Sequence, residues 1–581
     1  MIRKESAAAR RRRCLTGLVG FNNVGGDDLG PDQRVVQNGA KSMRPLAALV
    51  IASLLSATAS AAELDCEQLQ RSGIAGVKVL STSEVVGSLP AADVVKGRGP
   101  DANKVNPHLL NLPPFCRVIA ILNPVPRSRI EIEVWLPRQW NGKLLGIGSH
   151  GFGGNFERGD MAMGLHRGYA VVTSDLGHSS GTNERQAGFN VGLAEFAVGN
   201  EVAVDDFAWR ATHEMTVAAK NLVTLRYGAA PRRSYFDGCS NGGRQAMREA
   251  QQFPGDYDGI VAGSAAMNWT RSFASTLAQF QSGTLPSGER ITAQRLLLAH
   301  NAAIAACDRL DGLADGLIND PTRCNWKPDA LLCKAGGDRN DCLTADEVAA
   351  IARVENPLRH PVSGEELYVG LAPGSESSWR NMLSLNAVTA NYYRYMVVND
   401  PKWQPGPETN VFDLLQKSEQ PGSPGNRINS VNPDLSAFRA RGGRLIQYHG
   451  WNDPSFAPAD APRYYAEVVD LQSGPDKLQR TQDFYRLFMT PGMAHCYGGE
   501  GPVNFGALDH APAAAIDAKH DVLAALALWV EKGVAPNSII ATQVEDGKHS
   551  QRQMPLCPWP KVAAYVGGDA NSASSFACRA K

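Results

Sequence analysis

A serine, an aspartate and a histidine, in that order along the chain, have surroundings suited to nucleophilic catalysis. Ser240 lies in the segment GCSNG (238–242), which matches the pattern G-x-S-x-G. Asp453 lies in GWNDPSF and His495 in MTPGMAHC, each a few residues after an apolar run. A serine hydroxyl becomes a nucleophile when a histidine accepts its proton and an acid orients that histidine. The three residues therefore predict a catalytic triad for acyl transfer.

The segment around Ser240 also predicts the backbone that such a serine needs. A short strand-like run, RSYFDG, leads into the motif, and a helical pattern, GRQAMREAQQF, follows it. Strand, tight turn and helix form the nucleophile elbow of α/β-hydrolases, whose triad residues follow in the order Ser, Asp or Glu, His. The alternatives are a Gly-rich turn with a solvated serine, an Asx-turn at Asp453 before Pro454, and a structural role for His495.

Acyl transfer also needs two N–H donors for the oxygen of the tetrahedral intermediate. The backbone N–H of Asn241, the residue after the nucleophile, is expected to be the first. The second is expected from the Gly-rich segment GSHGFGG (148–154), which follows the apolar run KLLGI. The alternative is that this segment is only a flexible loop.

The elements that must position these residues alternate between strands and helices. Strand-like runs are RVIAIL, IEIEVWLP, KLLGIGS, YAVVTSD, SYFDG, GIVAGSA, RLIQYHG and RLFMTPG, with helical stretches such as 203–227 and 243–252 between them. Such alternation favours an α/β fold with a mostly parallel sheet. Between 267 and 434 the alternation stops, and prolines, aromatic residues and cysteines cluster. We therefore expect an α/β-hydrolase core, 62–266 and 435–581, with a large inserted lid domain, 267–434.

The N-terminus predicts export. Residues 43–61, MRPLAALVIASLLSATASA, combine a basic residue, a short apolar stretch and an Ala-Ser-Ala cleavage signal, which is the layout of a secretory signal peptide. Residues 1–42 are polar and Gly-rich, and we expect them to be a mis-assigned upstream leader, with translation starting at Met43. A twin-arginine signal at 10–13 is the alternative. The mature protein is expected to be secreted or periplasmic.

Ten cysteines follow the leader, an even number that suits an oxidising compartment. Neighbours in sequence suggest four disulfides: Cys66–Cys116, Cys307–Cys324, Cys333–Cys342 and Cys557–Cys578. That pairing leaves Cys239, next to Ser240, for Cys496, next to His495. Sequence alone does not prove this connectivity. A zinc site is disfavoured, because the chain has no C-x-x-C pair.

Charge argues against two classes of partner. The chain has 581 residues, with 58 Lys and Arg against 58 Asp and Glu. A neutral balance argues against a nucleic-acid surface and a polybasic membrane patch. No apolar run reaches the ~20 residues of a transmembrane helix. We expect a soluble protein with a small-molecule substrate, and the oligomeric state stays open.

An acidic segment inside the insertion predicts a metal site. The run CDRLDGLADGLINDPTRC (307–324) places Asp308, Asp311 and Asp315 close together. Carboxylates so near one another repel unless a cation lies among them, and oxygen-only ligands favour Ca²⁺. The spacing is not that of an EF-hand. A solvated acidic turn is the alternative.

Together these motifs resemble the tannase and feruloyl esterase family, which also contains mono(2-hydroxyethyl) terephthalate hydrolase. The specific marks are GCSNGGR, YHGWNDPSF, PGMAHC and CDRLDGLADGLINDPTRC, and the resemblance covers nearly all of the mature chain. It implies a disulfide between Cys239 and Cys496 and an oxyanion-hole donor at Gly151, where His150 replaces the Gly or Ser common in the family. It also implies a structural Ca²⁺, bound by Asp308, Asp311 and Asp315 with the carbonyls of Leu313 and Leu317.

The resemblance further implies a serine carboxylesterase without an organic cofactor. Its expected substrates are phenolic esters: feruloyl, other hydroxycinnamoyl or galloyl esters. The alternatives are a half-ester of terephthalate or phthalate, a peptidase with the same triad, and a non-catalytic binding protein on this scaffold. At most two of the aromatic residues of the insertion are expected in the substrate pocket: Trp379, Tyr392, Tyr393, Tyr395, Trp403 and Phe412. Arg380 and Arg394 are candidates for a substrate carboxylate.

Overall fold

The computed structural model describes residues 63–94, 104–179, 193–406, 408–508, 512–545 and 548–580. The leader and the signal peptide predicted at 1–42 and 43–61 lie outside these residues. No helix within the described ranges is long and apolar enough to cross a membrane.

One nine-stranded sheet runs through the molecule in the order β1-β2-β3-β5-β4-β6-β7-β10-β11. Strands β1, β2, β3 and β5 pair antiparallel, and every pair from β5 to β11 is parallel. The strands are β1 (Val77–Ser88), β2 (Leu110–Leu122), β3 (Ile130–Pro137), β4 (Lys143–Ile147), β5 (Ala170–Ser174), β6 (Arg233–Cys239), β7 (Gly259–Gly263), β10 (Arg444–Gly450) and β11 (Tyr485–Thr490).

Burial on both faces explains why the central strands are continuous apolar runs. All residues of β5 (AVVTS), β7 (GIVAG) and β11 (YRLFMT) are buried, as expected for parallel strands covered by helices on each side. One face carries α2 (Arg158–His166) and α17 (Val522–Lys532). The other carries α1 (Cys66–Leu69), α5 (Ala211–Tyr227), α6 (Asn241–Gln252) and α15 (Asp460–Asp470).

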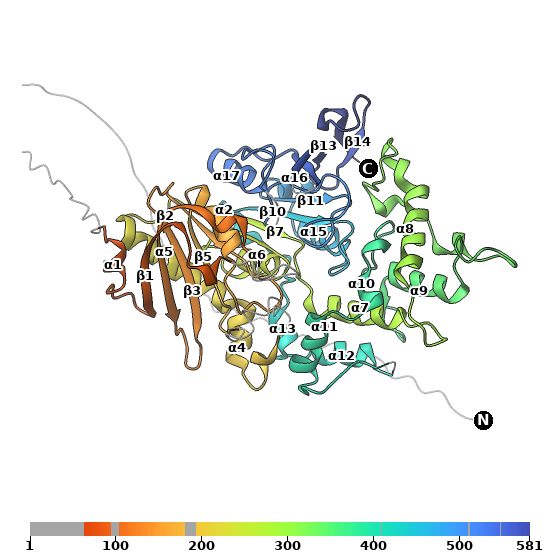
Figure 1. Ribbon diagram of the computed structural model, residues 1–581, viewed down its shortest axis with the longest axis horizontal. Coiled ribbons are helices and arrows are strands. Elements are labelled where there is room, and N and C mark those ends of the chain that lie inside the picture. The colour runs from red at the N-terminus through yellow and green to blue at the C-terminus, as the bar shows by residue number, and fades with distance from the viewer. Residues whose placement is uncertain are drawn as a thin grey trace, which may run out of the picture. The chain divides into compact units, whose positions relative to one another are not determined.

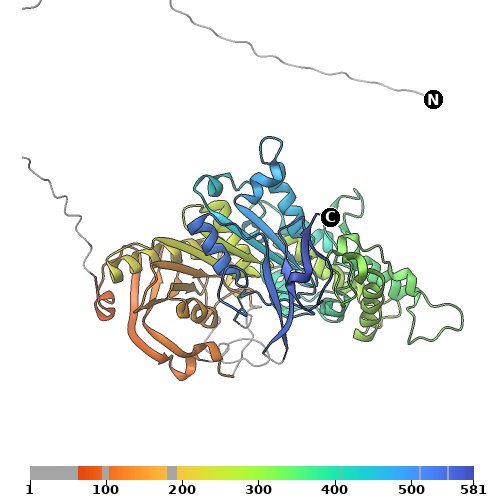
Figure 2. The ribbon, with the colours of Figure 1, turned by 90° about the horizontal axis from the view of Figure 1, so that it is seen from above.

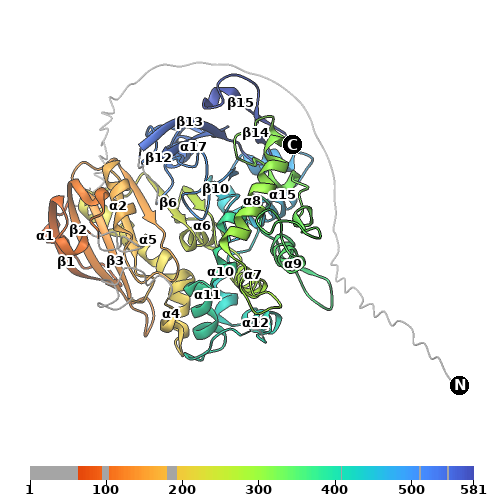
Figure 3. The ribbon, with the colours of Figure 1, turned by 45° about the vertical axis from the view of Figure 1, so that its right-hand side comes forward.

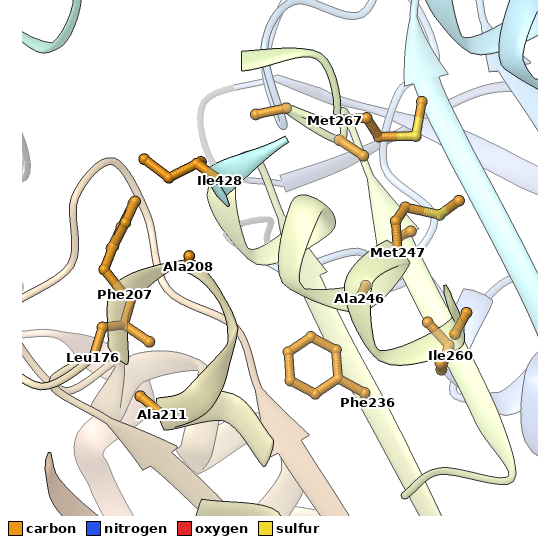
Figure 4. Packing of buried hydrophobic residues seen from close by; sticks show 14 of the residues in the cluster. Leu176, Phe207, Ala208, Ala211, Phe236, Ala246, Met247, Ile260, Met267 and Ile428 are labelled. Carbon is orange, nitrogen blue, oxygen red and sulfur yellow. The ribbon is translucent and has the colours of Figure 1, made fainter. Parts of the chain in front are cut away.

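Helix α6, which begins at the residue after Ser240, is fixed by its packing. Ala246 and Met247 on its buried face lie beside Phe236 of β6 and Ile260 of β7 (Figure 4). The same cluster includes Phe207 and Ala208, which belong to a π-helical turn, Asp206–Arg210, between α4 (Glu201–Asp205) and α5. The helix expected over 203–227 is therefore present, with a π-turn in it.

The segment between β7 and β10 adds no strand to the main sheet. Its helices α7 to α10 lie on the side of the core away from β1–β3 (Figures 1 and 3). Helices α8 to α10 pack around their own cluster, which includes Leu296, Ile351 and Trp379, whereas the buried face of α7 packs in the main core. The elements are α7 (Trp269–Ser282), α8 (Ala293–Cys307), α9 (Ala345–Glu355), β8 (Leu358–Arg359), β9 (Glu366–Tyr368), α10 (Arg380–Leu383), α11 (Ala387–Asn391), α12 (Val411–Ser418), α13 (Pro424–Ile428) and α14 (Ser436–Ala440).

The C-terminal part adds α16 (Lys477–Gln482) and two antiparallel pairs outside the main sheet. They are β12 (Ile539–Glu545) with β13 (Lys548–Leu556), and β14 (Val562–Tyr565) with β15 (Phe576–Arg579). The orange strands β1–β3 lie at one end in Figure 2 and the green inserted helices at the other, with the blue C-terminal strands between them.

Candidate active site

Ser240 lies in a strained turn between β6 and α6. Its φ of 62° and ψ of −121° belong to a backbone region that residues other than glycine seldom adopt. The turn is held from the neighbouring strand, because Ser240 N–H donates to Gly263 O at 3.0 Å and Ser240 O accepts from Ala266 N–H at 3.1 Å. Strand, turn and helix follow one another here as the sequence predicts.

Three glycines allow this turn to pack against the loop that follows β4. A Cβ atom on Gly238 would lie 2.6 Å from the carbonyl carbon of Gly242. A Cβ atom on Gly148 would lie 2.5 Å from the Cα of Gly242. Both distances are below van der Waals contact, and the obstructing atoms are backbone, which cannot rotate away. One close approach of two backbone segments therefore requires glycine at all three positions.

The predicted acid and base reach Ser240 from the ends of two further strands. Asp453 follows β10 and His495 follows β11. His495 Nε2 lies 2.9 Å from Ser240 Oγ, and His495 Nδ1 lies 2.8 Å from Asp453 Oδ2. The side chain of Asp453 is fully buried, whereas 25% of the His495 side chain is exposed. The structure thus brings the three predicted residues together in one hydrogen-bonded chain.

The hydrogen bonds assign the protons of this chain. Asp453 accepts from His495 Nδ1–H, so His495 Nε2 is free to accept the hydroxyl proton of Ser240. Burial alone would raise the pKa of Asp453. The neighbouring His495 and the hydrogen bonds from His449 and His495 outweigh burial and hold this pKa well below its ordinary value. Asp453 is therefore ionised at neutral pH.

A disulfide joins the residue before Ser240 to the residue after His495. Cys239 and Cys496 are bonded, with their Cα atoms 5.9 Å apart across 257 positions of sequence. Cys496 has a φ of 65°, so the backbone turns sharply where the bond is made. The bond ties the end of β6 to the loop that carries His495.

The other four disulfides are the pairs that sequence proximity suggests. Cys66–Cys116 joins α1 to β2, and Cys557–Cys578 joins the two C-terminal strand pairs. Cys307–Cys324 and Cys333–Cys342 lie within the insertion.

The two residues expected to form the oxyanion hole follow neighbouring strands of the sheet, β6 and β4. Asn241 begins α6 and is fully buried. Gly151, with a φ of 52°, lies in the loop after β4, the strand that pairs with β6. That loop is attached to α6, because Ser149 N–H donates to Gln245 Oε1 at 2.8 Å. Both expected donors are therefore held next to the elbow by backbone packing.

His150, the bulky residue of the same loop, lies among carboxylates. One ring nitrogen of His150 and one oxygen each of Glu157 and Asp160 lie within 4.8 Å of one another, and all three side chains are buried. Across the described part of the chain, no other group of three acidic, imidazole or thiol ligand atoms comes so close.

The acidic segment of the insertion forms a half-buried loop. Asp308 Oδ1 accepts from Asp315 N–H at 3.1 Å, Asp311 Oδ1 accepts from Leu313 N–H at 3.0 Å, and Arg552 donates to Asp315 Oδ2 at 2.9 Å. Burial, followed by the charges of Asp315 and Asp308, raises the pKa of Asp311 to about 6. The carboxylates are therefore crowded electrostatically, although their oxygens are too far apart to meet the 4.8 Å spacing of the His150 group.

The acidic segment also contacts the loop that carries His495. A Cβ atom on Gly492 would lie 2.8 Å from Leu317 Cδ2, and one on Gly501 would lie 2.6 Å from Leu317 Cδ1. Leu317 thus packs against backbone on both sides of His495. Sequence distance alone gave no sign of this contact.

An aromatic residue that sequence reasoning missed lies beside His495. The ring centroid of Phe456 is 5.3 Å from that of His495, Phe273 of α7 is 6.3 Å from Phe456, and Trp269 is 4.8 Å from Phe273. Phe456 follows Asp453 by three residues in the GWNDPSF motif, which is the signal that could have found it. These rings give the surroundings of His495 an aromatic character.

The aromatic residues expected from the insertion mostly pack within it. Trp379, Tyr392 and Tyr393 are almost fully buried. Of the two candidate arginines, Arg394 donates to Asn391 Oδ1 at 2.7 Å and Trp403 O at 3.1 Å. Arg380 is exposed at the surface.

A mostly parallel sheet covered by helices on both faces, with a serine at a strand–helix elbow and a histidine and an acid after later strands, defines an α/β-hydrolase. The family model described as tannase and feruloyl esterase matches residues 116–579. The chain belongs to this family, as its motifs predicted, and it is a carboxylic ester hydrolase.

Individual relatives match this sequence over most of its length. An uncharacterized esterase of Xanthomonas campestris pv. campestris is 36% identical over 576 residues, which cover 93% of this chain and 95% of that protein. A probable feruloyl esterase B-2 of Aspergillus terreus is 32% identical over 471 residues, 80% of this chain and 86% of that protein.

Solved structures of two esterases also match the fold of this chain. Feruloyl esterase B from Aspergillus oryzae matches with a TM-score of 0.78 at 31% identity, over 88% of this chain and 99% of that one. Tannin acyl hydrolase from Aspergillus niger matches with a TM-score of 0.69 at 21% identity, over 87% and 92%, and shares the fold.

Proposed function

We propose that this esterase hydrolyses esters of phenolic acids through an acyl-enzyme formed on Ser240. The observation that carries the proposal is the hydrogen-bonded chain from Ser240 Oγ through His495 to Asp453. His495 Nε2 takes the hydroxyl proton while Oγ attacks the ester carbonyl carbon. The backbone N–H groups of Asn241 and Gly151 stabilise the resulting oxyanion, and the positive end of the α6 dipole adds to them.

The second half of the reaction reverses these roles. His495 returns the proton to the departing alcohol, which leaves the acyl group on Ser240. A water molecule then gives a proton to His495 and attacks the acyl carbon. As the bond from that carbon to Ser240 Oγ breaks, His495 returns the proton to Oγ, which releases the acid and restores the hydroxyl. Asp453, ionised and buried, stabilises the positive charge on His495 in both steps.

An aromatic acyl group fits the observations. Relatives of known name are feruloyl esterases, and the rings of Phe456 and Phe273 extend from His495 towards the insertion. A hydroxycinnamoyl or galloyl ester is therefore the proposed substrate. A terephthalate half-ester would call for a cation near its free carboxylate, and two of the five donors of Arg394 already bond to Trp403 O and Asn391 Oδ1.

The acidic segment is proposed to hold a structural Ca²⁺. Carboxylate oxygens of Asp308, Asp311 and Asp315 with the carbonyls of Leu313 and Leu317 form the all-oxygen donor set that Ca²⁺ prefers. The raised pKa of Asp311 supports this, because its causes are burial and then the charges of Asp315 and Asp308, and a bound cation would offset that repulsion. The present spacing of the oxygens means that the side chains would have to rotate inward on binding.

Export is proposed from the predicted signal peptide, and the five disulfides suit an oxidising compartment. N-terminal sequencing of protein made in its natural host should begin at residue 62. A start that retains residues 43–61 would contradict cleavage of that signal.

Replacement of Ser240 by alanine tests the mechanism. We expect Ser240→Ala to lower kcat by a factor on the order of 10⁴ or more, because Ser240 is the nucleophile of the proposed acyl-enzyme. Ser287→Ala, at an exposed serine, is the matched control and should keep full activity. Steady-state rates on methyl ferulate, methyl gallate, chlorogenate and mono(2-hydroxyethyl) terephthalate would rank the substrate classes.

A fluorophosphonate probe gives a second readout on the same variant. Intact-mass analysis should show one adduct on the wild type, mapped to Ser240, and none on Ser240→Ala. Labelling of another serine, or near-normal turnover by the variant, would remove Ser240 from the mechanism. A preference for the terephthalate ester would leave the triad in place and overturn only the substrate class.

A further inference from the structure

Asp453 receives more hydrogen bonds than a three-residue triad supplies. Its Oδ1 accepts from the backbone N–H groups of Ser455 and Phe456, at 2.8 and 3.2 Å. Its Oδ2 lies 2.8 Å from His495 Nδ1 and 3.1 Å from Nε2 of a second histidine, His449. Two imidazoles therefore share one oxygen of the buried carboxylate.

The surroundings of His449 determine which of its nitrogens carries the proton. His449 is the sixth residue of β10 and is 1% exposed. Its Nε2 lies between two acceptors, Asp453 Oδ2 and Phe456 O, each at 3.1 Å. Its Nδ1 is buried, and no described residue hydrogen-bonds to it. A proton on Nδ1 would have no acceptor there, so Nε2 is the nitrogen that carries the proton.

We propose that His449 is a positioning residue for the reaction, which donates its Nε2–H to Asp453 Oδ2 and so sets the orientation and the basicity of the carboxylate that faces His495. The inference rests on the proposed role of Asp453 and His495. His449 touches neither Ser240 nor any reacting atom, and it acts only through Asp453. The carbonyl of Phe456 accepts the same Nε2–H, so the donation to Asp453 is one arm of a hydrogen bond shared between two acceptors.

Two charged groups near His449 have ion-pair partners of their own. Asp460 pairs with Arg463, and Arg271 pairs with Glu419. The hydroxyl of Tyr368 also interacts with Asp460 and Asp453. Burial raises the pKa of Asp460, and Arg463 opposes the shift. His449 is therefore the group besides His495 that supplies a side-chain donor to Asp453.

Loss of this donor has a defined chemical effect. A carboxylate oxygen with one donor fewer keeps more negative charge, and it stabilises the positive form of His495 more strongly. The acidic limb of kcat/KM should then move to higher pH, because catalysis needs neutral His495. A carboxylate free to rotate should also lower kcat with little change in KM.

Two amide replacements separate donation from packing. In His449→Gln the amide nitrogen can reach the position of Nε2, whereas in His449→Asn it reaches only about the position of Nδ1. We expect His449→Gln to stay within about threefold of the wild type. His449→Asn should lower kcat by about 10–100-fold and shift the acidic limb upward by about half a pH unit or more. Equal behaviour of the two variants, or an unshifted limb in His449→Asn, would overturn the proposal.

A measurement on the wild type keeps the proposal testable if a variant fails to fold. Nitrogen-15 NMR of histidine-labelled protein should show one buried imidazole in the neutral Nε2–H form across the active pH range, assigned to His449 with His449→Gln. A protonated Nδ1 at His449 would overturn the inference. Failure of the triad itself would show separately, as turnover by Ser240→Ala.

Discussion

At the scale of single residues, the close contact between Gly148 and Gly242 fixes the position of the loop after β4, which carries Gly151. The Cα of Gly242 occupies the space that a side chain on residue 148 would need. Because Gly151 is only three residues further along, a shift of this contact would move the N–H proposed for the oxyanion. Rate is sensitive to displacements of ~1 Å at such a site.

We therefore expect Gly148→Ala to lower both stability and kcat. Backbone must move to accept the new Cβ, at a cost of about 1–3 kcal/mol, and kcat should fall by about 10-fold or more because the oxyanion donors separate. Thermal unfolding and steady-state kinetics would measure both. Gly73→Ala is the control, since no atom lies within 4 Å of the Cβ it would add. Full activity in Gly148→Ala would contradict this account of the loop.

Motifs revealed some of these residues and not others. Ser240, Asp453 and His495 could be named from chain order, because each follows an apolar run in a distinctive segment. His449 lies in the motif YHGWNDPSF, but it precedes the acid, and the motif does not show which atom the imidazole contacts. Its role depends on a 3.1 Å contact that only the fold creates. Gly148 and Gly242 were each visible in a Gly-containing motif, but the contact between them was not.

At the scale of elements, the elbow and the His495 loop are joined twice, by hydrogen bonds of the triad and by Cys239–Cys496. β6 is separated from β11 by two strands of the sheet, β7 and β10. Flexibility at the end of either strand would widen the range of distances between Ser240 Oγ and His495 Nε2. The disulfide limits that spread, so its contribution should be larger in kcat than in substrate binding.

The Cys239→Ala/Cys496→Ala double variant tests this role. We expect kcat to fall by about 10–100-fold with KM within about threefold of the wild type, because the bond orders reacting groups. Chain entropy sets an upper limit of about 5 kcal/mol for the loss of stability. Cys333→Ala/Cys342→Ala removes a disulfide of the insertion and should leave kcat unchanged. Equal losses in the two double variants would assign the Cys239–Cys496 bond to stability alone.

The strands that position the site were predictable from the sequence, whereas β1 at one edge of the sheet and the two C-terminal strand pairs were not. All eight apolar runs form strands of the main sheet, because buried parallel strands consist of continuous apolar residues. Strand β1 was missed, since VKVLSTSEVVGS is polar and largely exposed at the sheet edge. The pairs β12–β13 and β14–β15 were missed for a similar reason: β13 begins KHSQRQ, and its pairing depends on distant segments.

At the scale of the whole molecule, the acidic segment connects three regions. It belongs to the insertion, Arg552 of β13 contacts Asp315, and Leu317 packs against the loop of His495. Whatever neutralises the carboxylates should therefore stabilise contacts between the insertion and the core. This arrangement lay beyond sequence reasoning, because the contacting residues are more than a hundred positions apart.

Calcium should stabilise the protein in a pH-dependent way. At 100 times its Kd, Ca²⁺ should raise Tm by about 2–3 °C, and Asp311→Asn should abolish the rise. The increment should shrink as pH falls through about 6, where Asp311 takes up a proton. Without metal, the pH dependence of stability has the opposite sign. The raised pKa of Asp311 stabilises the folded protein at pH values below its unfolded pKa, near 4. This stabilisation is lost as the pH rises through about 6.

Differential scanning calorimetry with Ca²⁺ or chelator, between pH 5 and 8, would measure these shifts, and elemental analysis would show whether purified protein holds the ion. Mg²⁺ at the same concentration is the control for ionic strength. A Tm that Ca²⁺ does not change at pH 7.5 would support the solvated acidic turn instead.

The bond between Cys239 and Cys496 closes residues 239 to 496 into a covalent ring, and the whole insertion is an arc of that ring. A ring opened at one point remains one molecule. A protease that cuts the exposed stretch 361–365, which lies in no other disulfide loop, would therefore leave Ser240 and His495 on fragments that cannot separate without a reductant. Such a nicked enzyme should run as a full-length chain on a non-reducing gel and as two pieces on a reducing one. A protease can thus cut the insertion while the two halves of the catalytic centre stay joined.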